Sequence, residues 1–485
     1  MGIVFKQSLI NTIILIAGFT IGGVNALFLY TNFLDESYYG LIIFILSTAN
    51  ILMPLLVFGM QHSVIKYFSS YTDKVDRDRL LTWSLIIPLV VIIPLGFFGV
   101  QCYEEISNWL AKENPLIKNY TVLIFICAIS MGYFEVYYAW TKVQLNSVFG
   151  NFVREMFARG CAAILLIALY YDVLTPNEFV YAITVVYVLR ALLMKLYAFY
   201  IYSPKFSFQF PARFKEVLQY SVYLILAGSA GTILLEIDKF MIPQVEAIAE
   251  VAYYAVGVFI ASVVAIPNRA MNQITHPLTA KDLNENALDK VSVLYKQSSI
   301  NLLVVGGLLF LLINLNLTDM YRIINKPQYA VGGWIVLMVS LAELYKLALG
   351  TNGAILTNSK YYRMFFYLSV GMTISVIVLN HYFIRAFGID GASLATLVTV
   401  LIFSTIKILY IQSKLRMQPF SNKTIALLLI MVLVGVGFYF VELSWQPLIN
   451  ILVKSVLITV TYSLLVIRLK ISNDVQTLVN KFIKL

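Results

Sequence analysis

Apolar stretches of membrane length recur along almost the whole chain. A helix needs about 20 mainly apolar residues to cross the hydrocarbon core of a bilayer. Windows of that length predict fourteen membrane-spanning helices, at residues 8–30, 39–60, 80–102, 119–140, 156–171, 177–201, 217–240, 251–273, 297–315, 331–349, 362–383, 391–412, 423–441 and 447–468. The connections between them are too short for a folded soluble domain. We therefore expect an all-α integral membrane protein.

The scarcity of charge agrees with a lipid environment. Of the 485 residues, 60% are hydrophobic and 12% are charged, whereas about 25% of the residues of a soluble domain are charged. Polar surface is therefore too limited to cover a water-soluble body of this size. The weakest of the predicted helices is 156–171, which is short and is entered through Arg154 and Arg159.

Lysine and arginine residues are distributed unevenly between two sets of loops. With the N-terminus in the cytoplasm, 23 of the 35 lie in predicted cytoplasmic loops and tails, and six lie in predicted external loops. Because positively charged loops stay in the cytoplasm, this bias predicts a multi-pass membrane protein with both termini cytoplasmic. Anionic lipid beside those loops explains the net charge of +10, and no nucleic-acid partner is expected. Amphipathic surface helices are predicted at 61–78, at 277–296 and in the tail, 471–485.

Two stretches of the chain share one order of features. KQSLINTIILIAGFTIGG, from Lys6, leads to DESYYG, and KEVLQYSVYLILAGSAGTI, from Lys215, leads to AEVAYYAVG. An even number of predicted helices separates them, so a duplication predicts two parallel lobes, as in transporters whose site lies between repeats. Chance similarity of apolar segments is the alternative. The resulting division is an N-terminal six-helix lobe at 1–211, a C-terminal six-helix lobe at 212–412, and two additional membrane helices with a cytoplasmic amphipathic tail at 413–485.

Four motifs in this order carry a family resemblance. FLDESYYGLIIFILSTANILMPLLVFGMQHSVIKYFSSY is followed by IDKFMI, then by AYY before the eighth predicted helix, and by FGIDGASLAT before the twelfth. From about residue 6 to 412 the chain resembles the bacterial polysaccharide and O-antigen flippases of the multidrug/oligosaccharidyl-lipid/polysaccharide exporter superfamily. None of these motifs is catalytic, and they are specific to a family rather than to a substrate.

The resemblance implies an exporter (MATE-like) fold and a location in the bacterial cytoplasmic (inner) membrane. It also implies a flippase for undecaprenyl-pyrophosphate-linked oligosaccharide, such as an O-antigen, capsule or other surface polysaccharide repeat unit. The expected partners are this polyprenyl-pyrophosphate-linked glycan and membrane lipid, and a polysaccharide polymerase and glycosyltransferases are further candidates. Translocation by alternating access needs no covalent chemistry, so we expect no enzyme activity, no catalytic residue and no cofactor. Because the chain has no GxxxxGK[ST] motif for ATP, an ion gradient or the substrate gradient must supply the energy.

Several cations lie within or at the ends of the predicted membrane helices, where a charge suggests a water-filled pathway or a partner. Arg190 lies near the middle of 177–201 and is the deepest. A cationic cavity suits a pyrophosphate, because Arg offers bidentate donors and Lys a point charge. The candidate pyrophosphate-binding residues are Arg190, Lys195, Arg269, Lys346 and Lys407. The alternative for each of these side chains is to reach the inner headgroups, which is hardest for Arg190 because it is the deepest.

Acidic residues in the predicted helices are candidates for ion coupling or gating. The set, with one adjoining lysine, is Asp238, Glu236, Lys239, Glu135 and Glu343. Each has an alternative: Glu343 can pair with Lys346 three residues on, the residues at 236–239 can form an interfacial ion pair, and Glu135 can reach cytoplasmic water. Glu155 and Arg159 can pair in the same way. No metal site is expected, because the three cysteines and three histidines are scattered.

Two other functions remain open from the sequence. One is an antiporter of drugs or metabolites with the same fold, although a site for cationic drugs favours carboxylates over these cations. The other is a membrane polysaccharide polymerase or ligase. Such an enzyme usually carries a long external loop, and the longest one here, at about 103–118, is too short for a folded domain.

Overall fold

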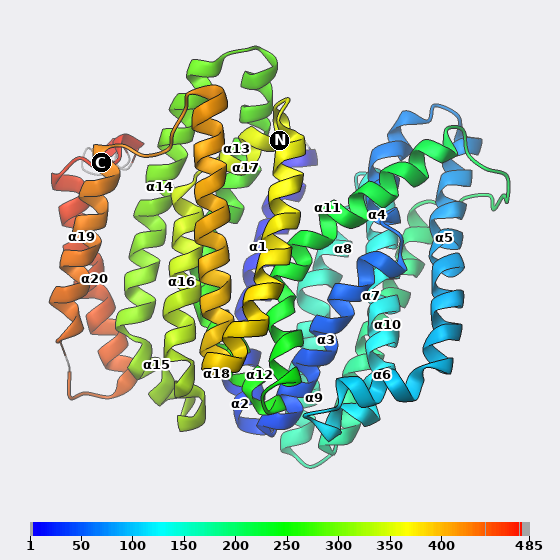
Figure 1. The fold of residues 1–485 in the computed structure, drawn as a ribbon, viewed down its shortest axis with the longest axis horizontal. Helices are drawn as coiled ribbons and strands as arrows, with labels where there is room; N and C mark the ends of the chain where they lie inside the picture. Colours follow the sequence, from blue (N-terminus) through cyan, green and yellow to red (C-terminus); the bar gives the residue numbers. More distant parts are fainter. Residues whose placement is uncertain (1–2, 442, 475, 478–485) are drawn as a thin grey trace. The chain divides into compact units, whose positions relative to one another are not determined.

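The computed structural model describes residues 3–441, 443–474 and 476–477, and all regular structure in them is helical. Within these residues twelve segments are long and apolar enough to cross a membrane (Figure 1). They are Leu9–Phe33, Glu36–Leu56, Lys74–Gln101, Pro115–Val143, Pro176–Ile201, Phe214–Gln244, Ile248–Arg269, Leu288–Leu315, Pro327–Ala348, Tyr362–Leu415, Asn422–Tyr439 and Pro447–Arg468. The prediction of an all-α, multi-pass membrane protein is confirmed.

The difference between twelve segments and fourteen predicted helices has two sources. The 54-residue segment α18 (Tyr362–Leu415) consists of two helices that join at a kink at Gly388, whose φ of 58° and ψ of −140° are not helical. These two helices contain the two predicted spans 362–383 and 391–412. Helices α8 (Val148–Phe152) and α9 (Ala158–Tyr170) are joined by a π-helix, η4 (Val153–Phe157), and together they contain the short predicted span 156–171. All fourteen predicted segments fall on helices.

The chain divides into two compact units, Met1–Ala252 and Tyr253–Leu485. Besides α8, η4 and α9, the first unit contains α1 (Ile3–Val24), η1 (Asn25–Leu29), α2 (Tyr30–Phe33), α3 (Glu36–Leu56), α4 (Met60–Tyr67), η2 (Phe68–Ser70), α5 (Lys74–Gln101), α6 (Tyr103–Leu110), η3 (Pro115–Tyr120), α7 (Thr121–Val143), α10 (Pro176–Ile201), α11 (Phe214–Met241) and η5 (Ile242–Gln244). Helix α12 (Ile248–Ser262) contains the boundary.

Helix α7 lies at the centre of the first unit and packs against α3, α4 and α10 (Figure 1). Its Phe134 and Trp140 are completely buried, and the core around them continues into α4, α5 and α10. The neighbouring helices begin at polar caps. Asp35 accepts a hydrogen bond from the Ser37 N–H at the start of α3, and Thr175 forms a capping box with Glu178 at the start of α10.

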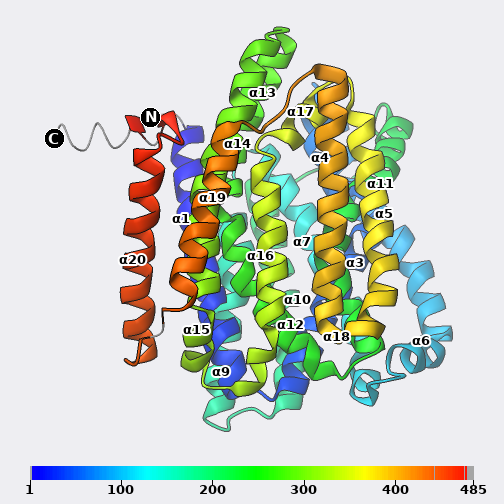
Figure 2. The same ribbon diagram turned by 60° about the vertical axis from the view of Figure 1, so that its left-hand side comes forward.

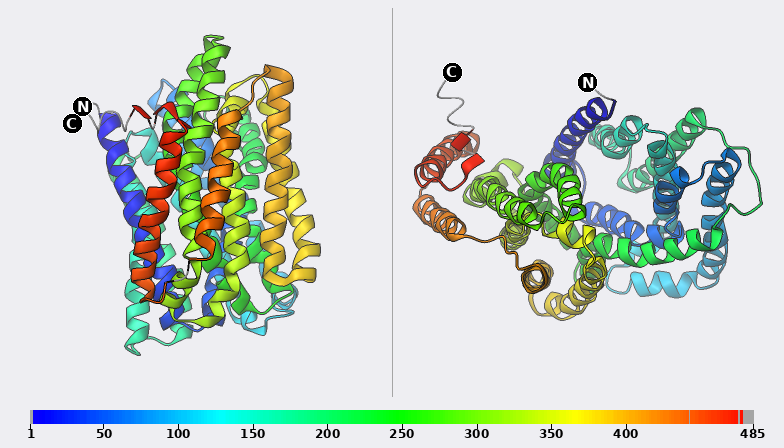
Figure 3. Two further views of the ribbon diagram at one scale, coloured as in Figure 1. Left: turned by 90° about the vertical axis from the view of Figure 1, so that its left-hand side faces the viewer. Right: turned by 90° about the horizontal axis from the view of Figure 1, so that it is seen from above.

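The second unit is organised around α14 (Leu288–Leu315). Its other elements are η6 (Val263–Ala265), α13 (Ile266–Asn284), α15 (Leu317–Ile324), η7 (Pro327–Gly332), α16 (Gly333–Ala348), α17 (Asn352–Asn358), α18, α19 (Asn422–Tyr439) and α20 (Pro447–Arg468). Figure 2 shows α14, α16 and the C-terminal half of α18 side by side, and Figure 3 shows α19 and α20 beside α14. The Tyr462 hydroxyl ties α20 to α14 by donating to the Val304 carbonyl oxygen at 2.9 Å.

The compact division falls later in the sequence than the predicted lobe boundary at 211/212. The reason is that α11, which opens the predicted second lobe, packs along α3 and α4. The lobe ranges 1–211, 212–412 and 413–485 stay a prediction. Of the predicted amphipathic stretches, 61–78 forms α4, η2 and the start of α5, and 277–296 forms the end of α13 and the start of α14. Residues 475 and 478–485 of the predicted tail lie outside the described residues.

Candidate functional site

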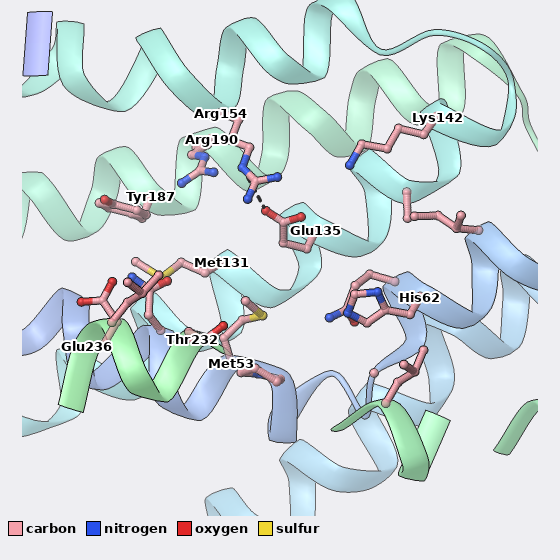
Figure 4. Close-up of a pocket in the computed structure, with 18 of the residues that line it drawn as sticks. Met53, His62, Met131, Glu135, Lys142, Arg154, Tyr187, Arg190, Thr232 and Glu236 are labelled. Atoms are coloured by element: carbon pink, nitrogen blue, oxygen red, sulfur yellow. Dashed lines mark ion pairs between the residues drawn. The ribbon is translucent and has the colours of Figure 1, made fainter. Parts of the chain in front are cut away.

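The first unit contains a cavity of about 560 Å³ (Figure 4). Helix α7 forms one wall, because Met131, Glu135, Ala139 and Lys142 recur at helical spacing and share one face. The other walls come from α3, α4, η4, α9, α10 and α11. Along α7 the lining extends over about 16 Å, since each helical residue rises 1.5 Å.

Seven charged side chains line the cavity. Four are cationic, Lys142, Arg154, Arg159 and Arg190, and three are carboxylates, Glu135, Glu155 and Glu236. The lining therefore carries one net positive charge when His62 is neutral. An anion is the complementary ligand for such a lining.

Two of the cations are held by glutamates. The Nε of Arg154 lies 3.7 Å from a Glu135 carboxylate oxygen and 3.9 Å from one of Glu155 (Figure 4). Arg159 Nη1 donates a hydrogen bond of 3.2 Å to Glu155 Oε2, which is the local pair expected from their spacing. These interactions leave Arg190 and Lys142 as the cavity cations without an ion pair among the described residues.

Arg190 is buried, with 9% of its surface exposed. Its guanidinium carbon lies 4.0 Å from the centroid of the Phe134 ring and 5.6 Å from that of Tyr187, and its Nε has no hydrogen-bond partner. Figure 4 shows the side chains of Arg190 and Arg154 in the cavity, and Arg190 is close enough to feel the charges of Arg154, Glu135 and Glu155. A buried cation without a counter-ion is unfavourable, and a bound anion relieves that cost.

Lys142 and His62 lie in the same part of the cavity (Figure 4). The Lys142 ammonium lies over the Tyr138 ring, 3.8 Å from its centroid. His62 is on α4, outside the membrane-length helices. Burial lowers the pKa of its imidazole below the usual 6.5, and the charge of Lys142 lowers it further, against the opposing effect of Glu135. The imidazole is therefore neutral at pH 7.

The position of Arg159 depends on the close approach of α1. A Cβ added at Gly18 would lie 2.7 Å from the Glu155 carbonyl oxygen, and one added at Gly22 would lie 3.2 Å from Arg159 Nε. Only glycine leaves room there for the η4–α9 segment and its arginine. A Gly-x-x-x-Gly spacing in an apolar helix is typical of such close helix packing.

Helix α11 forms one wall of the cavity, and polar contacts at both ends of this wall hold the helix to the rest of the first unit. At the α4 end, the hydroxyls of Ser63 and Ser221 are 2.7 Å apart. At the other end, the Asn114 amide donates to the carbonyl oxygens of Pro243 and Glu246, at 2.7 and 2.8 Å. The same side chain accepts a hydrogen bond of 2.8 Å from the Ile248 N–H.

The structure brings three of the predicted site residues, Arg190, Glu135 and Glu236, into this cavity. Glu236 also pairs with Lys239 at 2.8 Å. Lys195 lies on α10 but is exposed, and Asp238 is 4% exposed.

The remaining predicted residues belong to the second unit. Lys346 pairs with Glu343 at 2.7 Å, which confirms the expected local pair. The Lys407 ammonium lies 5.1 Å from the centroid of the Phe365 ring, and Arg269 is exposed.

Several cavity residues were not among the predicted site residues, and the charged or basic ones are His62, Lys142, Arg154, Glu155 and Arg159. The sequence reasoning placed the three cations in a cytoplasmic loop or at the start of a weak span. The usable signal was the pair Gly18 and Gly22, whose spacing indicates close packing of the first helix. Within the described residues, no group of three or more His, Cys, Asp or Glu side chains is placed to hold a metal ion.

Solved membrane transporters share this fold. The lipid II flippase MurJ in an inward closed conformation superimposes with a TM-score of 0.74 at 13% identity, covering 95% of this chain and 99% of that one. An inward-facing multidrug resistance MATE family transporter of the MOP superfamily gives a TM-score of 0.61 at 14% identity, covering 84% of this chain and 94% of that one. The molecule is therefore an integral membrane protein with the exporter fold. A search of curated protein sequences gave no significant match.

A sequence model describing polysaccharide biosynthesis proteins matches residues 5–276, more than half of the chain. The protein belongs to this family of polysaccharide biosynthesis proteins. The match confirms the family expected from the sequence motifs and includes every residue that lines the cavity.

Proposed function

We propose that this protein is a flippase that translocates undecaprenyl-pyrophosphate-linked oligosaccharide across the bacterial cytoplasmic membrane by alternating access. The glycan is an O-antigen, capsule or other surface polysaccharide repeat unit. Membership in a polysaccharide biosynthesis family and a fold similar to that of a lipid II flippase support this class of substrate. The uneven distribution of lysine and arginine supports cytoplasmic termini.

Arg190 is the observation that carries the proposal. A buried guanidinium with no ion pair, facing a cavity, is suited to a pyrophosphate, which accepts bidentate hydrogen bonds from arginine. Lys142 supplies a second positive charge in the same cavity. The oligosaccharide occupies the remaining polar space, while the polyprenyl chain stays in the bilayer.

The chain's own residues bind and release the head group without forming a covalent bond, so the protein acts as a transporter and not as an enzyme. Ion coupling through Glu135, Glu236, Asp238, Lys239 or Glu343 is part of this proposal. Arg269, Lys346 and Lys407 stay candidates for a second contact with the pyrophosphate. A polysaccharide polymerase and glycosyltransferases are the proposed functional partners.

One observation favours a second candidate, an ion-coupled antiporter of drugs or metabolites. The cavity contains three carboxylates, and a multidrug transporter has the same fold. The two functions differ in the charge of the ligand, because a cationic drug needs Glu135 or Glu236 and a pyrophosphate needs Arg190.

The test is delivery of surface polysaccharide in cells that depend on this protein. Arg190→Ala should abolish delivery at a normal protein level. Lys195→Ala is the matched control: it removes a cation from the same helix, and this side chain is exposed. Normal delivery by the Arg190→Ala variant would rule out the proposed role of the cavity.

A further inference from the structure

Glu135 occupies the place that an anionic ligand needs. Its carboxylate lies 3.7 Å from Arg154 Nε, which is longer than a hydrogen bond, and no second ion pair holds it among the described residues. Its partner Arg154 has a side chain that is 44% exposed, so a ligand in the cavity can reach the guanidinium. The pair joins α7 to η4, two elements that can change their contact without breaking either helix.

Glu155 is the other carboxylate near Arg154, and its position is more fixed. It accepts a hydrogen bond from Arg159 at 3.2 Å, four residues on along the same helical segment, and a Gly18 contact confines its backbone. An incoming anion therefore displaces Glu135 more easily than Glu155. Arg154 is the group that becomes available.

Arg154 and Arg190 both line the cavity, and their positive charges repel each other. A dianion between them satisfies both, whereas Glu135 carries one charge and forms its ion pair with Arg154. The charged groups that face Glu135 from the surrounding elements are His62 on α4, Lys142 on α7, Arg154, Glu155 and Arg159 on η4 and α9, Arg190 on α10 and Glu236 on α11. Within the part of the chain that the structure describes, Glu135 is the carboxylate in this set whose one ion pair is with Arg154.

We propose that Glu135 is a built-in competitor for the phosphate of the ligand: it neutralises Arg154 in the empty cavity, gives way when a pyrophosphate binds, and returns to Arg154 to release it. This inference rests on the proposed function and assigns a release role to one residue of that site. A transporter needs this balance, because its ligand must bind well enough to enter and weakly enough to leave.

The experiment measures binding of inorganic pyrophosphate to the purified full-length protein by titration calorimetry. Glu135→Gln keeps the shape of the side chain and removes its charge. It should tighten pyrophosphate binding about tenfold, which corresponds to about 1.4 kcal/mol. In cells the same variant should deliver less surface polysaccharide than the wild type, because release slows while binding improves.

Glu236→Gln is the matched control for net charge. It removes one negative charge from the same cavity, but this carboxylate is paired with Lys239. Its effect on the dissociation constant should stay below about threefold, as for a partly screened charge. Equal tightening by Glu236→Gln and Glu135→Gln would show a general charge effect and overturn the proposal.

Two more variants separate the failure of this inference from the failure of the proposed function. Arg190→Ala should weaken pyrophosphate binding whether or not Glu135 competes. If Arg190→Ala weakens binding and Glu135→Gln leaves it unchanged or weaker, competition by Glu135 is wrong and the proposed function stands. If the wild type does not bind pyrophosphate, or Arg190→Ala binds it equally well, the proposed function itself is wrong.

If Glu135→Gln fails to fold, the double variant Glu135→Gln/Arg154→Gln replaces it. Competition predicts that the double variant binds pyrophosphate more weakly than the wild type and as well as Arg154→Gln alone. A difference in affinity between the double variant and Arg154→Gln overturns the proposal.

Discussion

The side chain of Asn114 and the backbone of Ile248 are joined by a hydrogen bond of 2.8 Å in the first unit. Asn114 precedes η3, and Ile248 is the first residue of α12. Because the same carboxamide also donates to the carbonyl oxygens of Pro243 and Glu246, one buried residue satisfies three backbone groups of the α11–α12 turn. This turn follows the helix that forms one wall of the cavity.

Replacing Asn114 by alanine should destabilise the first unit. The substitution leaves the three backbone groups without their partner, and each buried group without a partner costs about 1–3 kcal/mol. We expect a lower melting temperature of the purified protein in detergent. Asn32→Ala is the control, since this exposed side chain donates to the Phe28 carbonyl oxygen and the Thr31 hydroxyl, both in its own helical segment. Equal melting temperatures for the two variants would contradict the role assigned to Asn114.

Alanine at Gly18 should also destabilise the protein, and alanine at Gly160 should not. The added Cβ at Gly18 meets the Glu155 carbonyl oxygen at 2.7 Å, whereas nothing lies within 4 Å of a Cβ added at Gly160. In a helix, alanine is favoured over glycine by about 1 kcal/mol. Thermal unfolding should therefore show a decrease for Gly18→Ala and no change or an increase for Gly160→Ala. The reverse order would show that α1 does not depend on this close approach.

The pH dependence of anion binding should reveal the protonation of the His62 imidazole. Burial lowers its pKa below 6.5, so the imidazole is neutral at pH 7 and gains its positive charge only as the pH falls through that lowered value. Pyrophosphate binding at pH 7 should be the same in His62→Gln and the wild type. As the pH falls below about 6.5, the wild type should bind increasingly more tightly than the variant. The ratio of the two dissociation constants cancels the titration of pyrophosphate itself, and a ratio that stays constant would contradict a titrating His62.

Most of the fold could be predicted from hydropathy alone, because every membrane helix must satisfy its own backbone hydrogen bonds and is marked by its apolar length. The prediction was least accurate where charge shortens the apolar window. The segment 148–170 contains Arg154, Glu155 and Arg159, so its apolar window is short. At Gly388 the chain turns with almost no connecting loop, so α18 consists of two helices joined at a kink, as the two predicted spans require.

The cavity was predictable only in part, for a physical reason. Arg190 was identifiable because its depth in an apolar helix makes an unpaired charge costly. Lys142 and Arg154 lie close to helix ends, where the same side chains normally face cytoplasmic water. Only the packing of α7, η4 and α10 shows that they turn into a common space, and no single-helix pattern contains that information.

Translocation by the purified protein in liposomes tests the central claim most directly. A polyprenyl-pyrophosphate-linked oligosaccharide is incorporated with the protein, and an impermeant glycosidase reports the fraction of head groups that reach the outer surface. We expect rapid exposure with the wild type and with Lys195→Ala, and exposure no faster than in protein-free liposomes with Arg190→Ala. Exposure by Arg190→Ala at the wild-type rate, or no exposure by the wild type, would contradict this account.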